Sequence, residues 1–85
     1  MRADKQSVTR LLKTARGQID GILKMIEEDR YCVDISNQLM ACEKVISRAN
    51  RTVLLAHIHG CVEAAMNAGD KGKADEIAAL LEKLL

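Results

Sequence analysis

An apolar pattern through the middle of the chain constrains the possible folds more than any other feature. From residue 32 to residue 60, apolar or small residues recur at alternating steps of three and four, close to the heptad pattern of a helix that packs along another helix. They are Cys32, Ile35, Leu39, Cys42, Ile46, Ala49, Val53, Ala56 and Gly60. The chain has no proline, so nothing here interrupts a helix. The pattern predicts one helix over residues 33–68, about 50 Å long at ~1.5 Å per residue, with Asp34 and Ser36 available to cap its start.

One further helix is predicted on each side of this long one. Residues 4–28 and 74–85 each carry apolar side chains at three- and four-residue steps on one face. A short polar connection over residues 28–31 joins the first helix to the second, and two glycines predict a turn over residues 68–73. We therefore expect an all-α fold: a three-helix subunit with a long first helix, a very long second helix and a short third helix, in a single domain over residues 1–85.

So small a chain is expected to need a partner. Its 85 residues include no Phe and no Trp, and Tyr31 is the single aromatic side chain, so its own core is small. The predicted second helix is also too long for one short companion helix to cover. Gly17 and Gly21 lie inside the first predicted helix, where each costs ~1 kcal/mol relative to Ala, and they indicate close approach by another helix. Self-association is the expected source of the missing contacts.

Composition excludes several classes of protein. Hydrophobic residues make up 48% of the chain and charged residues 29%, which is too apolar for intrinsic disorder. No apolar run approaches the ~20 residues needed to span a bilayer, and we identify no signal peptide. We therefore expect a cytoplasmic protein without membrane association, whose three cysteines stay reduced and available for metal or redox chemistry. We do not expect an enzyme, because the chain lacks a Ser-His-Asp set, paired catalytic carboxylates and a phosphate-binding loop.

Charge is distributed in blocks along the chain. The net charge is +1, but residues 1–24 hold six basic and two acidic side chains, and residues 25–43 hold one basic and five acidic side chains. Basic side chains return at Lys44, Arg48 and Arg51. A folded subunit could therefore present one basic face, although the same charges would also suit the solvent-exposed sides of ordinary amphipathic helices.

Two residues near the end of the long helix have the spacing of metal ligands. His57 and Cys61 stand four residues apart, which places both on one helix face within reach of one ion. Cys32 is the obvious third ligand, but it lies 29 residues before Cys61, ~43 Å away along a continuous helix. Either the helix breaks, or Cys32 comes from another subunit. In a two-fold dimer with antiparallel long helices, Cys32 of one chain would meet His57 and Cys61 of the other.

The donor set indicates which metal to expect. Two thiolates and one imidazole favour Cu(I), a soft ion that accepts low coordination numbers, so Cu(I) is the predicted cofactor. Zinc would require a fourth ligand, such as water or His59. His59 points ~200° around the helix from His57, which favours a solvent-exposed surface histidine. Cys42 belongs to the apolar pattern and is expected to be a packing residue.

Four parts of the chain carry a resemblance to a known family. They are residues 16–22 (RGQIDGI), 29–35 (DRYCVDI), 48–51 (RANR) and the spacing His57-x-x-x-Cys61. In this order, over nearly the whole chain, they resemble the copper-sensitive operon repressor (CsoR) family of bacterial transcription factors. The resemblance implies a homotetramer, built as a dimer of antiparallel four-helix-bundle dimers, that binds operator DNA and releases it when metal binds, derepressing copper-resistance genes. It also implies that Cys32, His57 and Cys61 bind Cu(I), with Cys32 supplied across the dimer.

The same resemblance assigns roles to residues around the ligands. Tyr31 matches a tyrosine that acts with a glutamate of the third helix, and Glu76, followed by Glu82, is the predicted glutamate. The chain departs from the usual pattern at Cys42 and at Leu11, where relatives often carry a DNA-contacting basic residue. Relatives that sense nickel or cobalt add histidine ligands, and those that sense persulfides use two cysteines without the histidine.

Operator double-stranded DNA is the predicted partner. No helix-turn-helix with a short recognition helix is evident, so we expect basic side chains of the first helix and of the middle of the second to contact DNA. They are Arg10, Lys13, Arg16, Arg48 and Arg51. Four subunits together would neutralise several phosphates, which predicts steeply salt-dependent affinity with specificity from DNA shape. A copper chaperone is a further predicted partner, as the metal donor.

Two other functions stay open. In the first, a cytosolic repressor of the same fold senses persulfides or thiol oxidation through Cys32 and Cys61, which crosslink across the dimer, and His57 is dispensable. In the second, the chain is a helical oligomerisation module without a ligand.

Overall fold

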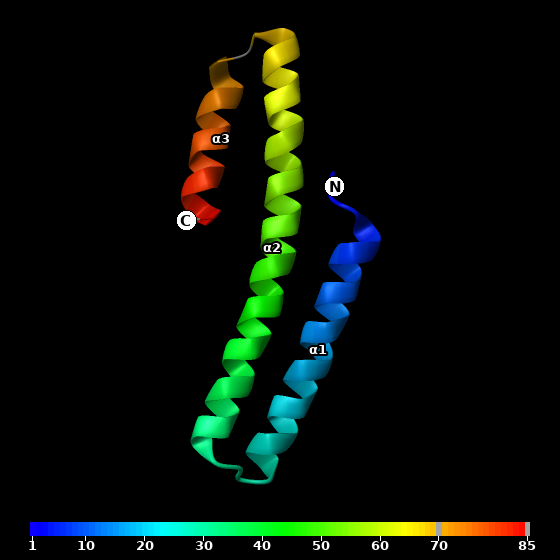
Figure 1. The fold of residues 1–85 in the computed structure, drawn as a ribbon, viewed down its shortest axis with the longest axis vertical. Coiled ribbons are helices and arrows are strands. Elements are labelled where there is room, and N and C mark those ends of the chain that lie inside the picture. Colours follow the sequence, from blue (N-terminus) through cyan, green and yellow to red (C-terminus); the bar gives the residue numbers. More distant parts are fainter. Residues whose placement is uncertain (70, 85) are drawn as a thin grey trace.

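The computed structural model describes residues 1–69 and 71–84, which form three helices in an elongated arrangement (Figure 1). Their order is α1 (Lys5–Glu27), α2 (Cys32–Ala68) and α3 (Lys71–Leu84), and these residues contain no strand. α2 runs along the whole molecule, which measures 58 × 25 × 12 Å. α1 packs antiparallel to the N-terminal half of α2, and α3 packs antiparallel to its C-terminal half (Figure 1). The predicted all-α fold with three helices is confirmed.

α1 starts at a side-chain cap. Its N-cap is Asp4, whose carboxylate accepts hydrogen bonds from the amide of Ser7 at 3.3 Å and from its hydroxyl at 2.6 Å. These bonds lower the pKa of Asp4, because they stabilise its charged form. The helix predicted over residues 4–28 is correct to one residue at each end.

A tight turn joins α1 to α2. The N–H of Arg30 donates to the carbonyl of Met25 at 3.0 Å. The N–H of Asp29 donates to the carbonyl of Ile26 at 3.1 Å, and this pair of bonds defines a Schellman motif. Asp29 has a φ of 50°, the left-handed conformation that the motif requires. The turn reverses the chain direction, so that α2 packs against α1, and it falls within the predicted short connection over residues 28–31.

α2 starts without a side-chain cap. It begins at Cys32, one residue earlier than predicted, and the side chain of its N-cap residue, Tyr31, makes no capping hydrogen bond. The expectation that Asp34 or Ser36 caps this helix is wrong, because the preceding turn already places residue 32 in helical conformation and both residues lie inside the helix. Asp34 instead occupies the first turn, where the partial positive charge of the helix N-terminus stabilises its carboxylate.

The turn between α2 and α3 is shorter than the predicted segment 68–73. Gly69 has a left-handed φ of 63°, and its N–H donates to the carbonyl of Ala65 at 2.8 Å, which ends α2. α3 begins at Lys71, three residues before its predicted start, so the second glycine of the segment lies inside α3. Asp70 and Leu85, which belong to the predicted turn and to the predicted third helix, lie outside the described residues.

The core between α1 and α2 is narrow. Ala15, Ile22 and Cys42 are buried, and Ile35 and Val45 pack against them. The thiol of Cys42 donates to the carbonyl of Ala15 at 3.7 Å, and Cys42 is a packing residue as predicted. No large side chain in the described part of the chain is fully buried. A subunit with so small a core gains little stability from its own contacts.

The side chains of the apolar pattern predicted over residues 32–60 point to two different sides of α2. Cys42 faces α1, whereas Leu39 and Ile46 are 46% and 45% exposed. Leu12 of α1 lines one shallow apolar groove of 260 Å³ together with Ile46. Residues seven apart lie on one side of a helix, which defines an exposed apolar face shared by the two helices. It consists of Leu12, Ile19, Ile26, Leu39 and Ile46.

Two further features of the helices are the surroundings of the α1 glycines and the hydropathy of each helix. An added Cβ at Gly17 or at Gly21 would meet nothing within 4 Å, so the expected close approach by another helix is wrong within this chain. The reason is that Ala15 and Ile22, rather than the glycines, face α2. Within residues 1–69 and 71–84, no helix combines the length and the hydropathy needed to cross a membrane.

Replacing Ile22 by Ala should destabilise the subunit. Ile22 is 5% exposed in the core between α1 and α2. Its truncation removes buried methylene groups and leaves a cavity, so we expect the free energy of unfolding in urea to fall by about 2–5 kcal/mol. Met40→Ala removes a similar volume at a site that is 49% exposed, and the change there should stay within about 0.5 kcal/mol. Equal losses in the two variants would contradict the assignment of the core.

Candidate metal centre

Three potential metal ligands meet where α3 packs against α2. His57 and Cys61 lie one turn apart on α2, with Nε2 of the histidine 3.4 Å from Sγ of the cysteine. Glu76 comes from α3, and its Oε1 lies 3.1 Å from the same Nε2 atom. The three ligand atoms lie within 4.8 Å of one another, which is close enough for one ion. The structure thus places the predicted His57 and Cys61 side by side and adds Glu76.

The centre is buried on one side and open on the other. Cys61 is 4% exposed. The side chains of His57 and Glu76 are 45% and 42% exposed. The thiol is therefore sheltered from water, while the open side leaves room for a ligand from outside the chain.

Glu76 is stabilised as a carboxylate by two neighbours. Oε1 accepts a hydrogen bond from Nε2 of His57, and Oε2 lies 3.6 Å from Nζ of Lys73. The hydrogen bond from His57, followed by the positive charge of Lys73, holds the pKa of Glu76 below its ordinary value of 4.5. Because a carboxylate only accepts, this pairing puts the imidazole proton on Nε2 in the metal-free protein.

Cys32 is the first residue of α2 and Tyr31 is its N-cap, so both lie at the end of the helix opposite to the centre. α2 is continuous from Cys32 to Ala68, so the alternative in which the helix breaks is wrong. Cys32 lies ~43 Å from Cys61 at ~1.5 Å per residue, a gap that no side chain closes. Tyr31, which precedes Cys32, is 64% exposed, whereas Glu76 contacts His57 in the C-terminal half of α2. A single chain therefore does not bring the predicted Cys32 and Tyr31 to the centre.

The remaining predicted residues near the centre lie on the surface. His59 has an 80% exposed side chain that pairs with Glu63 at 3.4 Å, as expected for a surface histidine. Glu82 of α3 is exposed and does not belong to the ligand group. Glu76, the first of the two predicted glutamates, is the one that contacts His57.

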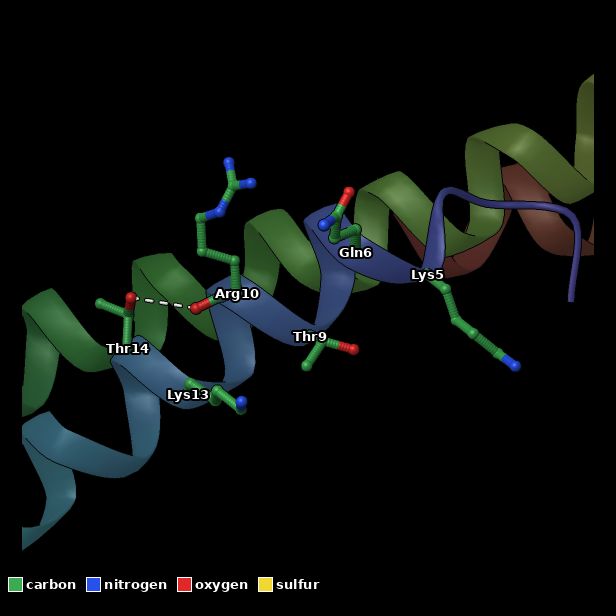
Figure 2. A pocket seen from close by; sticks show the side chains of 6 residues that line it. All are labelled: Lys5, Gln6, Thr9, Arg10, Lys13 and Thr14. Carbon is green, nitrogen blue, oxygen red and sulfur yellow. Dashed lines mark hydrogen bonds between the residues drawn. The ribbon is translucent and has the colours of Figure 1, made fainter.

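Predicted DNA-contacting residues of α1 line a shallow groove on its outer side (Figure 2). The groove has a volume of 680 Å³ and is lined by Lys5, Gln6, Thr9, Arg10, Lys13 and Thr14. Figure 2 shows the basic side chains extending outward from the helix. Arg16 is exposed but does not line this groove.

A second groove lies on α2. It has a volume of 470 Å³ and is lined by Lys44, Ser47, Arg48, Arg51, Thr52 and Leu55. Each groove therefore combines three basic side chains with hydroxyl groups, a combination that suits phosphate oxygens. Lys5 and Lys44 are additions to the predicted set. The position of Lys44 four residues before Arg48 was a signal for it, because that spacing places both on one helix face.

The chain has relatives of known function. A family model described as metal-sensitive transcriptional repressor matches residues 4–83. The copper-sensing transcriptional repressor CsoR of Mycobacterium ulcerans is 46% identical over 70 residues, which cover 82% of this chain and 59% of that protein. The CsoR of Bacillus subtilis is 39% identical over 84% of this chain and 70% of its own length. The copper-sensing transcriptional repressor RicR of Mycobacterium tuberculosis is 32% identical over 95% of this chain and 88% of its own length.

A solved structure has the same fold. The nickel-responsive transcriptional regulator InrS superimposes with a TM-score of 0.88 at 24% identity, covering 100% of this chain and 97% of that one. The chain spans 56% to 59% of the length of the mycobacterial CsoR proteins that it matches.

Removing His57 should raise the pKa of Glu76. Because the folded-state pKa lies below 4.5, the hydrogen bond stabilises the fold above that pH, and this contribution is lost as the pH falls through the lower folded-state value. In His57→Ala we expect the carboxyl carbon of Glu76 to titrate closer to 4.5 in a ¹³C NMR titration. His59→Ala is the matched control, since His59 pairs with Glu63 instead. An unchanged titration of Glu76 in His57→Ala would contradict the proposed cause.

Proposed function

Because this chain belongs to the metal-sensitive transcriptional repressor family, we propose that it is a copper-responsive repressor that binds operator DNA without metal and releases it when Cu(I) binds. The family consists of transcriptional repressors, so no catalytic residue is assigned. The observation that carries the proposal is the adjacency of the half-exposed His57 and the buried Cys61, with Nε2 3.4 Å from Sγ. The target DNA places such a repressor in the cytoplasm, where a copper chaperone is the expected metal donor.

The donor chemistry of the centre supports Cu(I). Cys61 supplies a thiolate, His57 an imidazole, and we assign Cys32 as the second thiolate, a set that suits a soft ion with few ligands. Glu76 is engaged by His57 and Lys73, and its role is to orient the imidazole. When bound, Cu(I) supplies a bond between Cys32 of one subunit and the other two ligands of its partner.

The geometry of α2 supports a site shared between subunits. Cys32 and Cys61 are separated by 29 residues, about eight turns at 3.6 residues per turn, so they point to the same side of α2. Leu39 and His57 are separated by 18 residues, about five turns, and belong to that side too. Two copies packed antiparallel along this side would bring Cys32 to the partner subunit's His57 and Cys61, with Ile46 near the two-fold axis.

The exposed apolar face supports the same dimer. Leu39 and Ile46 lie on the side of α2 that carries the ligands, and Leu12 lines one groove with Ile46. Side chains of this face are 45% to 53% exposed in a single chain. Their burial against a second copy would stabilise the pair by roughly 25 cal/mol per Å² of apolar surface. The result is an antiparallel four-helix bundle, and two such bundles form the proposed tetramer.

The two basic grooves are the proposed DNA contacts. Arg10 and Lys13 on α1, with Arg48 and Arg51 on α2, would neutralise phosphates in each of four subunits. Linking Cys32 to the far end of the partner's α2 changes how the grooves of the two subunits are spaced. A ~100-fold loss of DNA affinity corresponds to a coupling free energy of about 3 kcal/mol. Arg16, outside both grooves, stays a predicted contact.

Mixing two inactive variants tests whether the site is shared. Cys32→Ala and Cys61→Ala each remove one ligand from both sites of a homodimer, so neither should bind Cu(I) tightly. In a mixed dimer one site is complete, with Cys32 from the Cys61→Ala chain and the other ligands from the Cys32→Ala chain. An equal, co-refolded mixture should bind about a quarter of the wild-type amount in titrations against a Cu(I) chelator. No recovery in the mixture, with full binding by Cys42→Ala as control, would contradict the shared site.

Release of DNA tests the function itself. A duplex selected from a random-sequence library by the metal-free protein should dissociate on addition of Cu(I), with a loss of affinity of about 100-fold in fluorescence anisotropy. Cys32→Ala, His57→Ala and Cys61→Ala should bind the duplex but fail to release it, and Cys42→Ala should behave as wild type. Release from Cys32→Ala or Cys61→Ala on copper addition would refute the mechanism. Normal regulation of His57→Ala by a persulfide, without copper binding, would favour the thiol-sensing alternative.

A further inference from the structure

A glycine next to the metal ligands holds the side chain of Arg2. Gly60 precedes Cys61 in α2 and is buried. A Cβ on Gly60 would lie 2.5 Å from Cδ, 2.6 Å from Nε and 2.7 Å from Cζ of Arg2, distances that real Cβ contacts do not show. The flat guanidinium end of Arg2 thus occupies the space that a side chain at position 60 would fill. A glycine inside a helix lowers its stability by ~1 kcal/mol relative to Ala. The contact with Arg2 explains why a glycine stands at position 60, because a larger residue would collide with the arginine.

The segment between Arg2 and α1 is short and anchored. Ala3 is 8% exposed, so it is buried against the helices. Asp4 caps α1 through its two hydrogen bonds with Ser7. Two anchored residues therefore separate Arg2 from the first turn of α1, and a displacement of the Arg2 backbone is passed to that turn.

The contact joins the metal centre to the basic groove of α1. On one side, Gly60 is adjacent to Cys61 and three residues from His57, so it belongs to the turn of α2 that carries both ligands. On the other side, α1 begins with Lys5, and Arg10 follows in the next turn, both of which line the groove. We propose that Arg2 on Gly60 is a positioning contact that transmits the state of the His57 and Cys61 centre to the basic groove of α1. This inference rests on the proposed function, and it names a route for its regulation.

A purely structural role for Arg2 predicts a different experimental outcome. If Arg2 only packs on Gly60, its loss lowers stability and leaves the effect of Cu(I) on DNA affinity unchanged. If the contact transmits the state of the centre, its loss reduces that effect even in a folded protein, because coupling requires contacts that differ between the two states. A direct contact of Arg2 with DNA is distinguished as well, because Gly60→Ala retains the arginine.

Hydrogen exchange of the metal-free protein tests the contact between Arg2 and Gly60 without DNA or copper. Gly60→Ala should displace Arg2, and both Gly60→Ala and Arg2→Ala should increase exchange of the Ser7 and Val8 amides, which donate to Asp4 at the start of α1, by about tenfold. Gly21→Ala is the matched control, a helical glycine with nothing within 4 Å of an added Cβ, and it should leave the exchange of these two amides unchanged. Unchanged exchange in both Gly60→Ala and Arg2→Ala would overturn the proposal, as would an equal increase in Gly21→Ala.

Coupling is then measured as the ratio of affinities for the selected duplex without and with Cu(I). Gly60→Ala and Arg2→Ala should each lower a ratio of about 100 to about 10 or less, and the double variant should lower it no further. Cu(I) affinity in the absence of DNA should stay within about twofold of wild type. A wild-type ratio in both single variants would overturn the proposal. A wild-type protein that neither binds Cu(I) nor releases DNA would refute the proposed function instead, and the exchange result would stand independently.

Discussion

Thirty-seven residues in one unbroken helix form α2, and a helix of that length cannot fold back to bring its own ends together. Cys32 begins this helix, and Cys61 lies near its other end, on the same side. α1 covers a different side of α2 and leaves Leu39 and Ile46 exposed. The rigidity of α2 thus separates the proposed ligands within a chain and aligns them along one side, and Leu39 and Ile46 on that side are left exposed. In the proposed dimer, a second copy in antiparallel orientation would both cover the exposed apolar side chains and complete the ligand set.

Stability and sensing are consequently linked. The subunit core contains Ala15, Ile22 and Cys42, and none of these is a large side chain buried in full. Much of the apolar surface that could stabilise the chain belongs to the exposed apolar face, so in the proposed dimer the folding free energy would depend on association and hence on protein concentration. Because the proposed ligand set is complete only in the same association, metal binding and subunit packing stabilise the same state.

Most of the fold could be predicted because its elements are encoded locally. Apolar spacing identified all three helices, and Gly69 ends α2 as its left-handed conformation allows. The start of α3 could not be predicted, since two nearby glycines each suit a turn and only packing against α2 selects one. Likewise, the spacing of His57 and Cys61 identified a ligand pair, but choosing Glu76 over Glu82 depends on how α3 lies on α2. Arg2 carried no signal, because its contact with Gly60 joins residues far apart in the sequence.

α3 is a helix of 14 residues, near the length at which an isolated helix is marginal in water. It packs on α2 without support from α1, and one of its ties to α2 is the hydrogen bond between Glu76 and His57. Any event that takes the imidazole away from Glu76 removes one contact that keeps this helix folded. The packing of α3 on α2 therefore shares one side chain with the proposed metal centre, so a change at His57 would act on this short helix as well as on the metal.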